Sequence, residues 1–171
     1  MPDKQPQIEF EHDDFDFVTL EEELRVDERC RTLLQQFYAY LQIGGVTPEH
    51  ASELAYAADY YVRDYVLDFS RQNLVRPVAG LVRRYAASWY ATRTLEPDMA
   101  VLERHLDAIG AFYRFLHDRH LIGVDELAMI TAEVEQRDYY RARIERFLEL
   151  KGDGYEAWER ECPLQPGEGE Q

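Results

Sequence analysis

Five arginines share a stretch of the chain that contains no acidic residue. They are Arg71, Arg76, Arg83, Arg84 and Arg93. A guanidinium group binds a phosphate or a carboxylate through two parallel hydrogen bonds, which a lysine ammonium cannot do. The same window, residues 69–95, also contains Trp89 and Tyr90, and both residue types are enriched at interfaces. The pattern predicts a surface for an anionic partner, either nucleic acid or an acidic protein segment, with Arg83 and Arg84 as principal ligands.

Two histidines form the best pattern for a metal site. His117 and His120 are three positions apart on one helical face, and Asp125 or Glu126 is near enough in sequence to be a third ligand. No cysteine cluster accompanies them, and no predicted helix contains a Glu-x-x-His pair of the kind that builds a di-iron bundle. We therefore expect no metal and no cofactor. An enzyme would need this histidine pair to hold a metal.

Residues for nucleophilic catalysis are sparse. The serines are Ser52, Ser70 and Ser88, and none lies in a Gly-x-Ser-x-Gly turn. Cys30 and Cys162 have no histidine nearby in sequence, and they are too few for a disulfide framework. No glycine-rich phosphate loop is present. These observations favour a protein that is not an enzyme.

The charge of the chain is unevenly distributed. The net charge is −15, with −8 in residues 1–30, zero in residues 31–123 and −7 in residues 124–171. Such a balance disfavours nucleic acid, because binding to phosphates needs a basic footprint. We expect the acidic segments 8–30 and 153–170 to fold over the arginine window and to compete with its partner. Screening by salt would weaken such masking.

Twelve tyrosines suggest a second function. Tyr56, Tyr60, Tyr61 and Tyr65 line one predicted helix, where their rings can fill the seams of a core or form an interface. Acidic and apolar residues alternate through residues 8–18, as in segments that dock on a partner. The alternative function is therefore an acidic protein–protein adaptor that binds no nucleic acid.

Helical periodicity predicts an all-α fold, since no segment alternates with period two for long enough to be a strand. The expected helices begin near Thr19, Pro48, Pro77, Pro97 and Asp125, and the last runs to about Lys151. Thr19 forms a capping box with Glu22, and proline suits the first turn of a helix. We expect a bundle of two crossed helical hairpins plus a long C-terminal helix over residues 19–152. Flexible acidic tails are expected at 1–18 and 153–171.

The expected location is the cytoplasm. No apolar run approaches the roughly 20 residues that cross a bilayer, so no membrane contact is expected. The N-terminus is acidic and lacks the apolar region of a secretory signal. The sequence leaves the oligomeric state open.

The helical pattern of residues 31–130 resembles the core-binding domain of tyrosine recombinases and phage integrases. The stretches that carry the resemblance are 33–41 (LLQQFYAYL), 47–49 (TPE), 60–69 (YYVRDYVLDF), 95–97 (LEP), 102–106 (LERHL) and 112–116 (FYRFL). The resemblance implies a four-helix, SAM-like bundle that helps to clamp DNA. In that family a separate C-terminal domain carries the tyrosine nucleophile, and residues after 130 are too few to form one, so strand cleavage is not expected. The family's domain is basic, whereas this chain is acidic.

Overall fold

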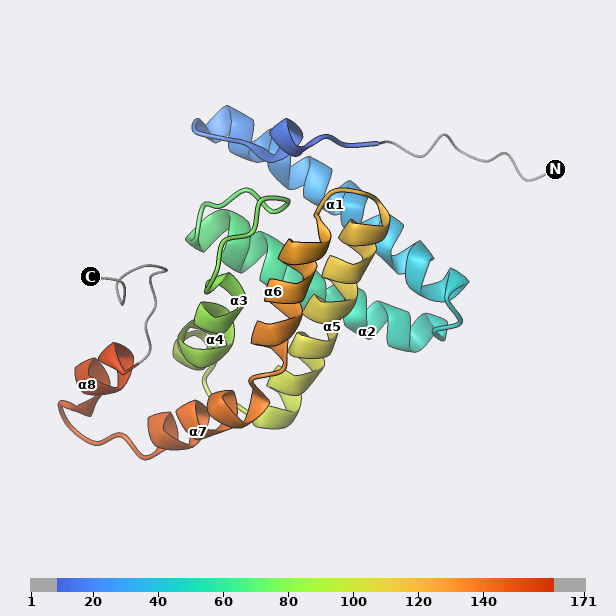
Figure 1. The fold of residues 1–171 in the computed structure, drawn as a ribbon. Helices are drawn as coiled ribbons and strands as arrows, with labels where there is room; N and C mark the ends of the chain where they lie inside the picture. The colour runs from blue at the N-terminus through green and yellow to red at the C-terminus, as the bar shows by residue number, and fades with distance from the viewer. Residues whose placement is uncertain (1–8, 162–171) are drawn as a thin grey trace.

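The structure is a computed structural model that describes residues 9–161, and every regular element in this range is helical (Figure 1). The all-α prediction is confirmed. The elements are η1 (His12–Phe15), α1 (Leu20–Ile43), α2 (Pro48–Asp59), η2 (Tyr60–Phe69), α3 (Leu81–Arg84), η3 (Tyr85–Trp89), α4 (Tyr90–Arg93), α5 (Met99–Asp118), α6 (Val124–Val134), α7 (Arg137–Leu148) and α8 (Gly154–Arg160). Segment η1 is a 3-10 turn, whereas η2 and η3 are π-helical.

Two predicted helix starts are confirmed at their capping residues. The Thr19 hydroxyl accepts the Glu22 backbone N–H, and the Glu22 carboxylate accepts the Thr19 N–H in return. The Thr47 hydroxyl caps α2, which begins at Pro48. The third and fourth helices begin later than predicted, at Leu81 and Met99 instead of at the prolines. In both cases the proline belongs to the loop before the helix.

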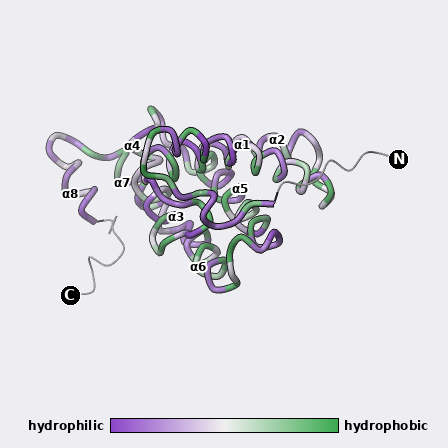
Figure 2. The backbone as a smooth tube through the Cα atoms, turned by 90° about the horizontal axis from the view of Figure 1, so that it is seen from above, coloured by the Kyte–Doolittle hydropathy of each residue, from purple (hydrophilic) through white to green (hydrophobic). Residues whose placement is uncertain are grey.

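Several of the helical elements join end to end, so that two continuous rods pack with the other helices around one core. Residues 48–69 form the first rod (α2 and η2), and residues 81–93 form the second (α3, η3 and α4). Helix α2 packs against α1 on one side and against α5 on the other, and α6 runs beside α5 (Figure 1). Hydrophilic and hydrophobic residues alternate along the helices, as amphipathic helices around a shared core require (Figure 2).

The predicted long fifth helix is wrong, because the chain turns between α6 and α7. The break at residues 135–136 separates two apolar stripes that have different main neighbours. Helix α6 packs mainly against α5 and also against α3, whereas α7 packs mainly against η3 and less against α5. One straight helix could not bury both stripes.

The predicted tails are also wrong over the described residues that they include. Phe15 on η1 is 0% exposed and belongs to the core, although acidic residues surround it in sequence. Trp158 on α8 is buried as well. A single large ring that finds a cavity is enough to hold a short polar segment on the body. The rest of both predicted tails, 1–8 and 162–171, lies outside the described residues.

None of the helices in residues 9–161 combines the length and the apolar character that a membrane span requires.

Candidate anion-binding surface

A buried carboxylate fixes the start of the 81–93 rod, which carries three of the five arginines. Glu133 of α6 is 7% exposed, and its two oxygens accept the backbone N–H groups of Gly80 and Arg83, at 3.1 and 2.9 Å. These are two of the unpaired donors that every helix N-terminus presents. At the same end, the Tyr65 hydroxyl donates to the Leu81 carbonyl at 2.6 Å. The rod is therefore held by α6 and by η2.

The two π-helical segments, η2 and η3, face each other across a cluster of aromatic rings. Short π-helical stretches are rare and are often found at functional sites, because the wider turn shifts side chains out of the regular helical register. Ring centroids of neighbours in the cluster lie 5.1–6.2 Å apart. The cluster consists of Tyr60, Tyr61, Tyr65, Phe69, Tyr85, Trp89 and His105. Its rigid packing fixes the position of the ring at its edge, Phe69.

Phe69 lies between two arginines, and we call this group the Arg84–Phe69–Arg93 surface. The guanidinium carbon of Arg84 is 5.1 Å from the ring centroid, and that of Arg93 is 5.3 Å away. The Phe69 ring is 39% exposed. Within residues 9–161 neither arginine forms an ion pair. A guanidinium that stacks on a ring keeps its edge N–H groups free for an anion.

Two small cavities adjoin this surface. One, of about 180 Å³, is lined by Arg84, Arg93 and Glu159 of α8, among others. The other, of about 260 Å³, is lined by Asp64 and Asp68 together with Arg93. The two guanidinium groups therefore lie inside a rim of three carboxylates. A ligand must place its own negative charges at two separate points to bind here.

Two of the other predicted ligands lie apart from this surface. Arg83 stacks on Tyr139 of α7, at 4.9 Å from its centroid, and Tyr90 is buried against His105. Trp89 is 6% exposed, lines both cavities and lies 5.7 Å from the Arg93 guanidinium carbon, so it forms the buried edge of the surface. The structure thus brings Arg84 and Arg93 together and separates them from Arg83.

Arg71 and Arg76 are paired with acidic residues near the N-terminus. Arg76 donates to both carboxylate oxygens of Asp16, at 2.9 and 3.1 Å, and to Asp13 at 2.6 Å. Arg71 donates to Glu23 at 3.1 Å and stacks on Phe17. These are contacts of the kind that the charge distribution predicts for residues 8–30.

The histidine pair shows no metal-binding arrangement in the described part of the chain. His117 lies 3.7 Å from Asp118, whereas His120 is exposed in the loop after α5 with a φ of +61°. Glu126, a suggested third ligand, accepts the Gly123 backbone N–H and caps α6. No group of three or more metal-ligating side chains occurs in residues 9–161.

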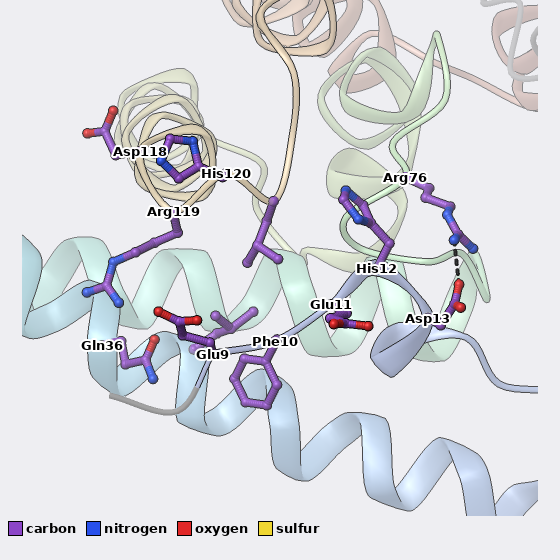
Figure 3. Close-up of a pocket in the computed structure, with 12 residues that line it drawn as sticks. Glu9, Phe10, Glu11, His12, Asp13, Gln36, Arg76, Asp118, Arg119 and His120 are labelled. Atoms are coloured by element: carbon purple, nitrogen blue, oxygen red, sulfur yellow. Dashed lines mark hydrogen bonds and ion pairs between the residues drawn. The ribbon is translucent and has the colours of Figure 1, made fainter. Parts of the chain in front are cut away.

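A cavity of about 710 Å³ lies between residues 9–13 and the loop that follows α5. Figure 3 shows Phe10 and His12 on one side of it and Arg119 and His120 on the other. Its walls carry both signs of charge, so it shows no preference for one class of ligand.

Because of His105, we expect the free energy of unfolding to fall in acid. His105 lies 2.6 Å from the Tyr85 hydroxyl through Nδ1, and burial, aided by Arg104, lowers its pKa to about 4 from the ordinary 6.5. Between pH 6.5 and pH 4 the unfolded chain binds a proton at His105 that the folded chain does not bind. The contribution of neutral His105 to the free energy of unfolding is therefore fully present above pH 6.5 and is lost as the pH falls towards 4. We expect urea denaturation of His105→Gln to show a smaller loss of stability from pH 7 to pH 5 than the wild type. His117→Gln, on the same helix, is the control, and an equal pH dependence in all three proteins would contradict the assignment.

Sequence reasoning missed Phe69 and Glu133. Phe69 marks the start of the acid-free window, a signal that could have directed attention to it. Nothing in the sequence distinguishes Glu133 from the other acidic residues on helix faces.

Comparison of the chain with models of protein families, with curated proteins and with solved structures finds no match.

Proposed function

We propose that this protein is a non-catalytic helical binding module that takes an acidic protein segment on the Arg84–Phe69–Arg93 surface. The observation that supports this most strongly is the pair of guanidinium groups stacked on one exposed ring without a carboxylate partner in residues 9–161. In a chain with a net charge of −15, most arginines of residues 9–161 form an ion pair, whereas Arg84 and Arg93, like Arg83 and Arg104, form none.

The charge around the surface favours a protein segment over nucleic acid. The affinity of a protein for nucleic acid grows with the number of phosphates that it neutralises, and two arginines neutralise few. Asp64, Asp68 and Glu159 line the same cavities and would repel a continuous row of phosphates. A protein segment carries its carboxylates at discrete positions and can place apolar side chains against Phe69.

The molecule itself contains an example of such binding. Arg71 stacks on Phe17 while it donates to the carboxylate of Glu23. The same combination of an aromatic ring, a guanidinium and a carboxylate is what an acidic segment would complete at Arg84 or Arg93. Charge-assisted hydrogen bonds of this kind contribute about 1.5–3 kcal/mol each where they are shielded from water.

The test is the charge-reversal variant Arg84→Glu/Arg93→Glu. A fluorescein-labelled peptide of alternating glutamate and phenylalanine is titrated with the full chain, and fluorescence anisotropy gives Kd. We expect the variant to bind at least about tenfold more weakly, because the loss of one charge-assisted hydrogen bond already has that effect. A labelled single-stranded oligonucleotide is measured in parallel.

The matched control is Arg31→Glu/Arg104→Glu, which changes the net charge equally at exposed positions on α1 and α5. An equal loss in both variants would show a general charge effect and would refute the site. Tighter binding of the oligonucleotide than of the peptide, lost in Arg84→Glu/Arg93→Glu, would assign the surface to nucleic acid instead.

A further inference from the structure

The N-terminal segment, residues 9–17, lies against a surface of the body that we call the seat, whose contacts with the segment come from Arg29, Arg71, Asn73 and Arg76. We propose that the seat is a second docking site for an acidic, phenylalanine-containing segment of a partner protein, which residues 9–17 occupy within the chain and must leave before the partner binds. The inference rests on the proposed function for the class of partner, and it adds a separate site and a means of control.

The contacts of the segment show what the seat recognises. Phe15 fills a core position, and its ring meets that of Phe10 at 5.4 Å. Arg76 binds the carboxylates of Asp13 and Asp16. The body thus provides a buried site for one aromatic ring and a guanidinium that holds two acids. Its ligand is an acidic segment with a buried phenylalanine.

The body also holds the backbone of the segment without regard to its sequence. The Asn73 side-chain amide donates to the His12 carbonyl at 3.0 Å, and Arg29 donates to the Asp14 carbonyl at 2.6 Å. Carbonyl groups are common to every peptide, so these two side chains would serve another segment equally well. Recognition of a peptide through its main chain with side-chain pockets for specificity is a recurrent binding mode.

Several features make the segment suitable for exchange. Within the described residues no backbone–backbone hydrogen bond joins residues 9–18 to the body, and the only regular structure in the segment is the short turn η1. The ion pairs of Arg76 are about half exposed, so water and salt weaken them. On one side the segment borders the cavity of about 710 Å³ instead of packed protein (Figure 3). Release of residues 9–17 therefore breaks no backbone–backbone hydrogen bond, and what it breaks is the burial of Phe15, the ion pairs of Arg76 and two hydrogen bonds from body side chains to the segment's carbonyls.

Residues 9–17 occupy the seat more readily than a free partner segment of equal affinity, because they are tethered to it. A short connection gives residues 9–17 an effective concentration in the millimolar range, so a partner at micromolar concentration binds only when the tethered segment is weakened. A change in salt, modification of the acidic residues or a tighter partner segment would have this effect.

The experiment uses the full chain and, as probe, a fluorescein-labelled synthetic peptide of residues 9–18. The variant Asp13→Asn/Asp16→Asn loosens the tethered segment without touching the core. We expect this variant to bind the peptide at least about fivefold more tightly than the wild type, because two exposed ion pairs of the competitor are gone. Phe15→Ala in the full chain is a second way to open the seat and should give the same gain. A peptide with Phe15→Ala should lose at least about tenfold in affinity, since its buried ring supplies most of the apolar contact.

The control for charge is Glu96→Gln/Glu145→Gln, which removes two acidic charges at exposed positions outside the segment, where neither carboxylate has an ion-pair partner in residues 9–161. If neither Asp13→Asn/Asp16→Asn nor Phe15→Ala exceeds this control in peptide affinity, the proposal is overturned. A complex of two chains at the peptide-binding concentration, seen by native mass spectrometry without peptide, would make a second copy the occupant and would also overturn it.

The outcomes separate the two sites. In the Asp13→Asn/Asp16→Asn background, Arg76→Glu should abolish the gain in peptide affinity over the wild type, whereas Arg84→Glu/Arg93→Glu should leave that gain within about twofold. The reverse result would refute the seat as a docking site and would support the Arg84–Phe69–Arg93 surface as the site of peptide binding. Binding that neither substitution changes would refute this inference, and the proposed function would then rest on its own test alone.

Discussion

Glu133→Ala is expected to lower the free energy of unfolding by about 3 kcal/mol, an effect typical of the loss of a buried hydrogen-bonded charge. Each oxygen of this carboxylate accepts one backbone N–H at the start of the 81–93 rod. Alanine would leave the Gly80 and Arg83 N–H groups without acceptors in a site that water barely reaches. It would also remove a negative charge from the positive end of the rod.

Chemical denaturation followed by circular dichroism measures this effect. Glu133→Gln should recover only part of the loss, because its NH₂ group would face a backbone N–H where the second carboxylate oxygen now lies. Glu135→Ala, an exposed position two residues further along, is the control and should change stability by less than about 0.5 kcal/mol. Similar stabilities for Glu133→Ala and Glu135→Ala would show that the carboxylate does not hold the rod.

Arg143→Ala is expected to release α8 and to destabilise the fold by about 3 kcal/mol, since it breaks a buried charged network. Arg143 is 3% exposed, donates to the carbonyls of Ala87 and Trp158 at 2.9 and 2.5 Å, and stacks on the Trp158 ring at 3.9 Å. The Trp158 indole N–H in turn donates to the Arg143 carbonyl at 2.9 Å. One side chain therefore joins α7, η3 and α8.

Hydrogen exchange distinguishes release of α8 from general unfolding. In Arg143→Ala the amides of residues 154–160 should exchange much faster than in the wild type, while those of α5 remain protected. Arg146→Ala is the matched control, because Arg146 joins α8 only through an exposed ion pair with Glu161. Arg146→Ala should lower the free energy of unfolding by less than about 1 kcal/mol. Unchanged exchange of residues 154–160 in Arg143→Ala would contradict this role.

The parts of the fold that the sequence predicts are those that depend on local chemistry. Helix starts at Thr19 and Pro48 follow from capping hydroxyls and from the fixed φ of proline, which act within four residues. The sequence pattern predicts one helix that continues past Val134, and this is wrong. An apolar stripe shows which residues are apolar but not which neighbour they meet. That choice is made by tertiary packing.

The candidate site was predictable in composition but not in geometry. The acid-free window contains Arg84 and Arg93 among its five arginines, although its pattern predicts Arg83 and Arg84 as the principal ligands. The arrangement of Arg84 and Arg93 around Phe69 depends on π-helical turns, for which the sequence has no signal. The burial of Trp89 is not predicted either, because an aromatic residue next to arginines has the same sequence pattern on a surface and at the edge of a core.

The segment before α1 illustrates a different limit. Its acidic residues predict a solvated tail, yet Phe15 is fully buried because the body provides a cavity of the right shape. Such a long-range match cannot be read from local composition. The resemblance to the integrase core-binding domain stays a hypothesis, and the nucleic-acid arm of the binding experiment bears on it directly.

The most direct test of the account is an NMR titration of ¹⁵N-labelled protein with the Glu/Phe peptide, observed at the side-chain Nε–H signals of the arginines. We predict shifts for Arg84 and Arg93 and for the indole N–H of Trp89 beneath them, with little change at Arg31 or Arg104. Shifts confined to Arg104 and its neighbours on α2 and α5, with Arg84 and Arg93 unperturbed at saturation, would contradict the assignment of the Arg84–Phe69–Arg93 surface as the binding site.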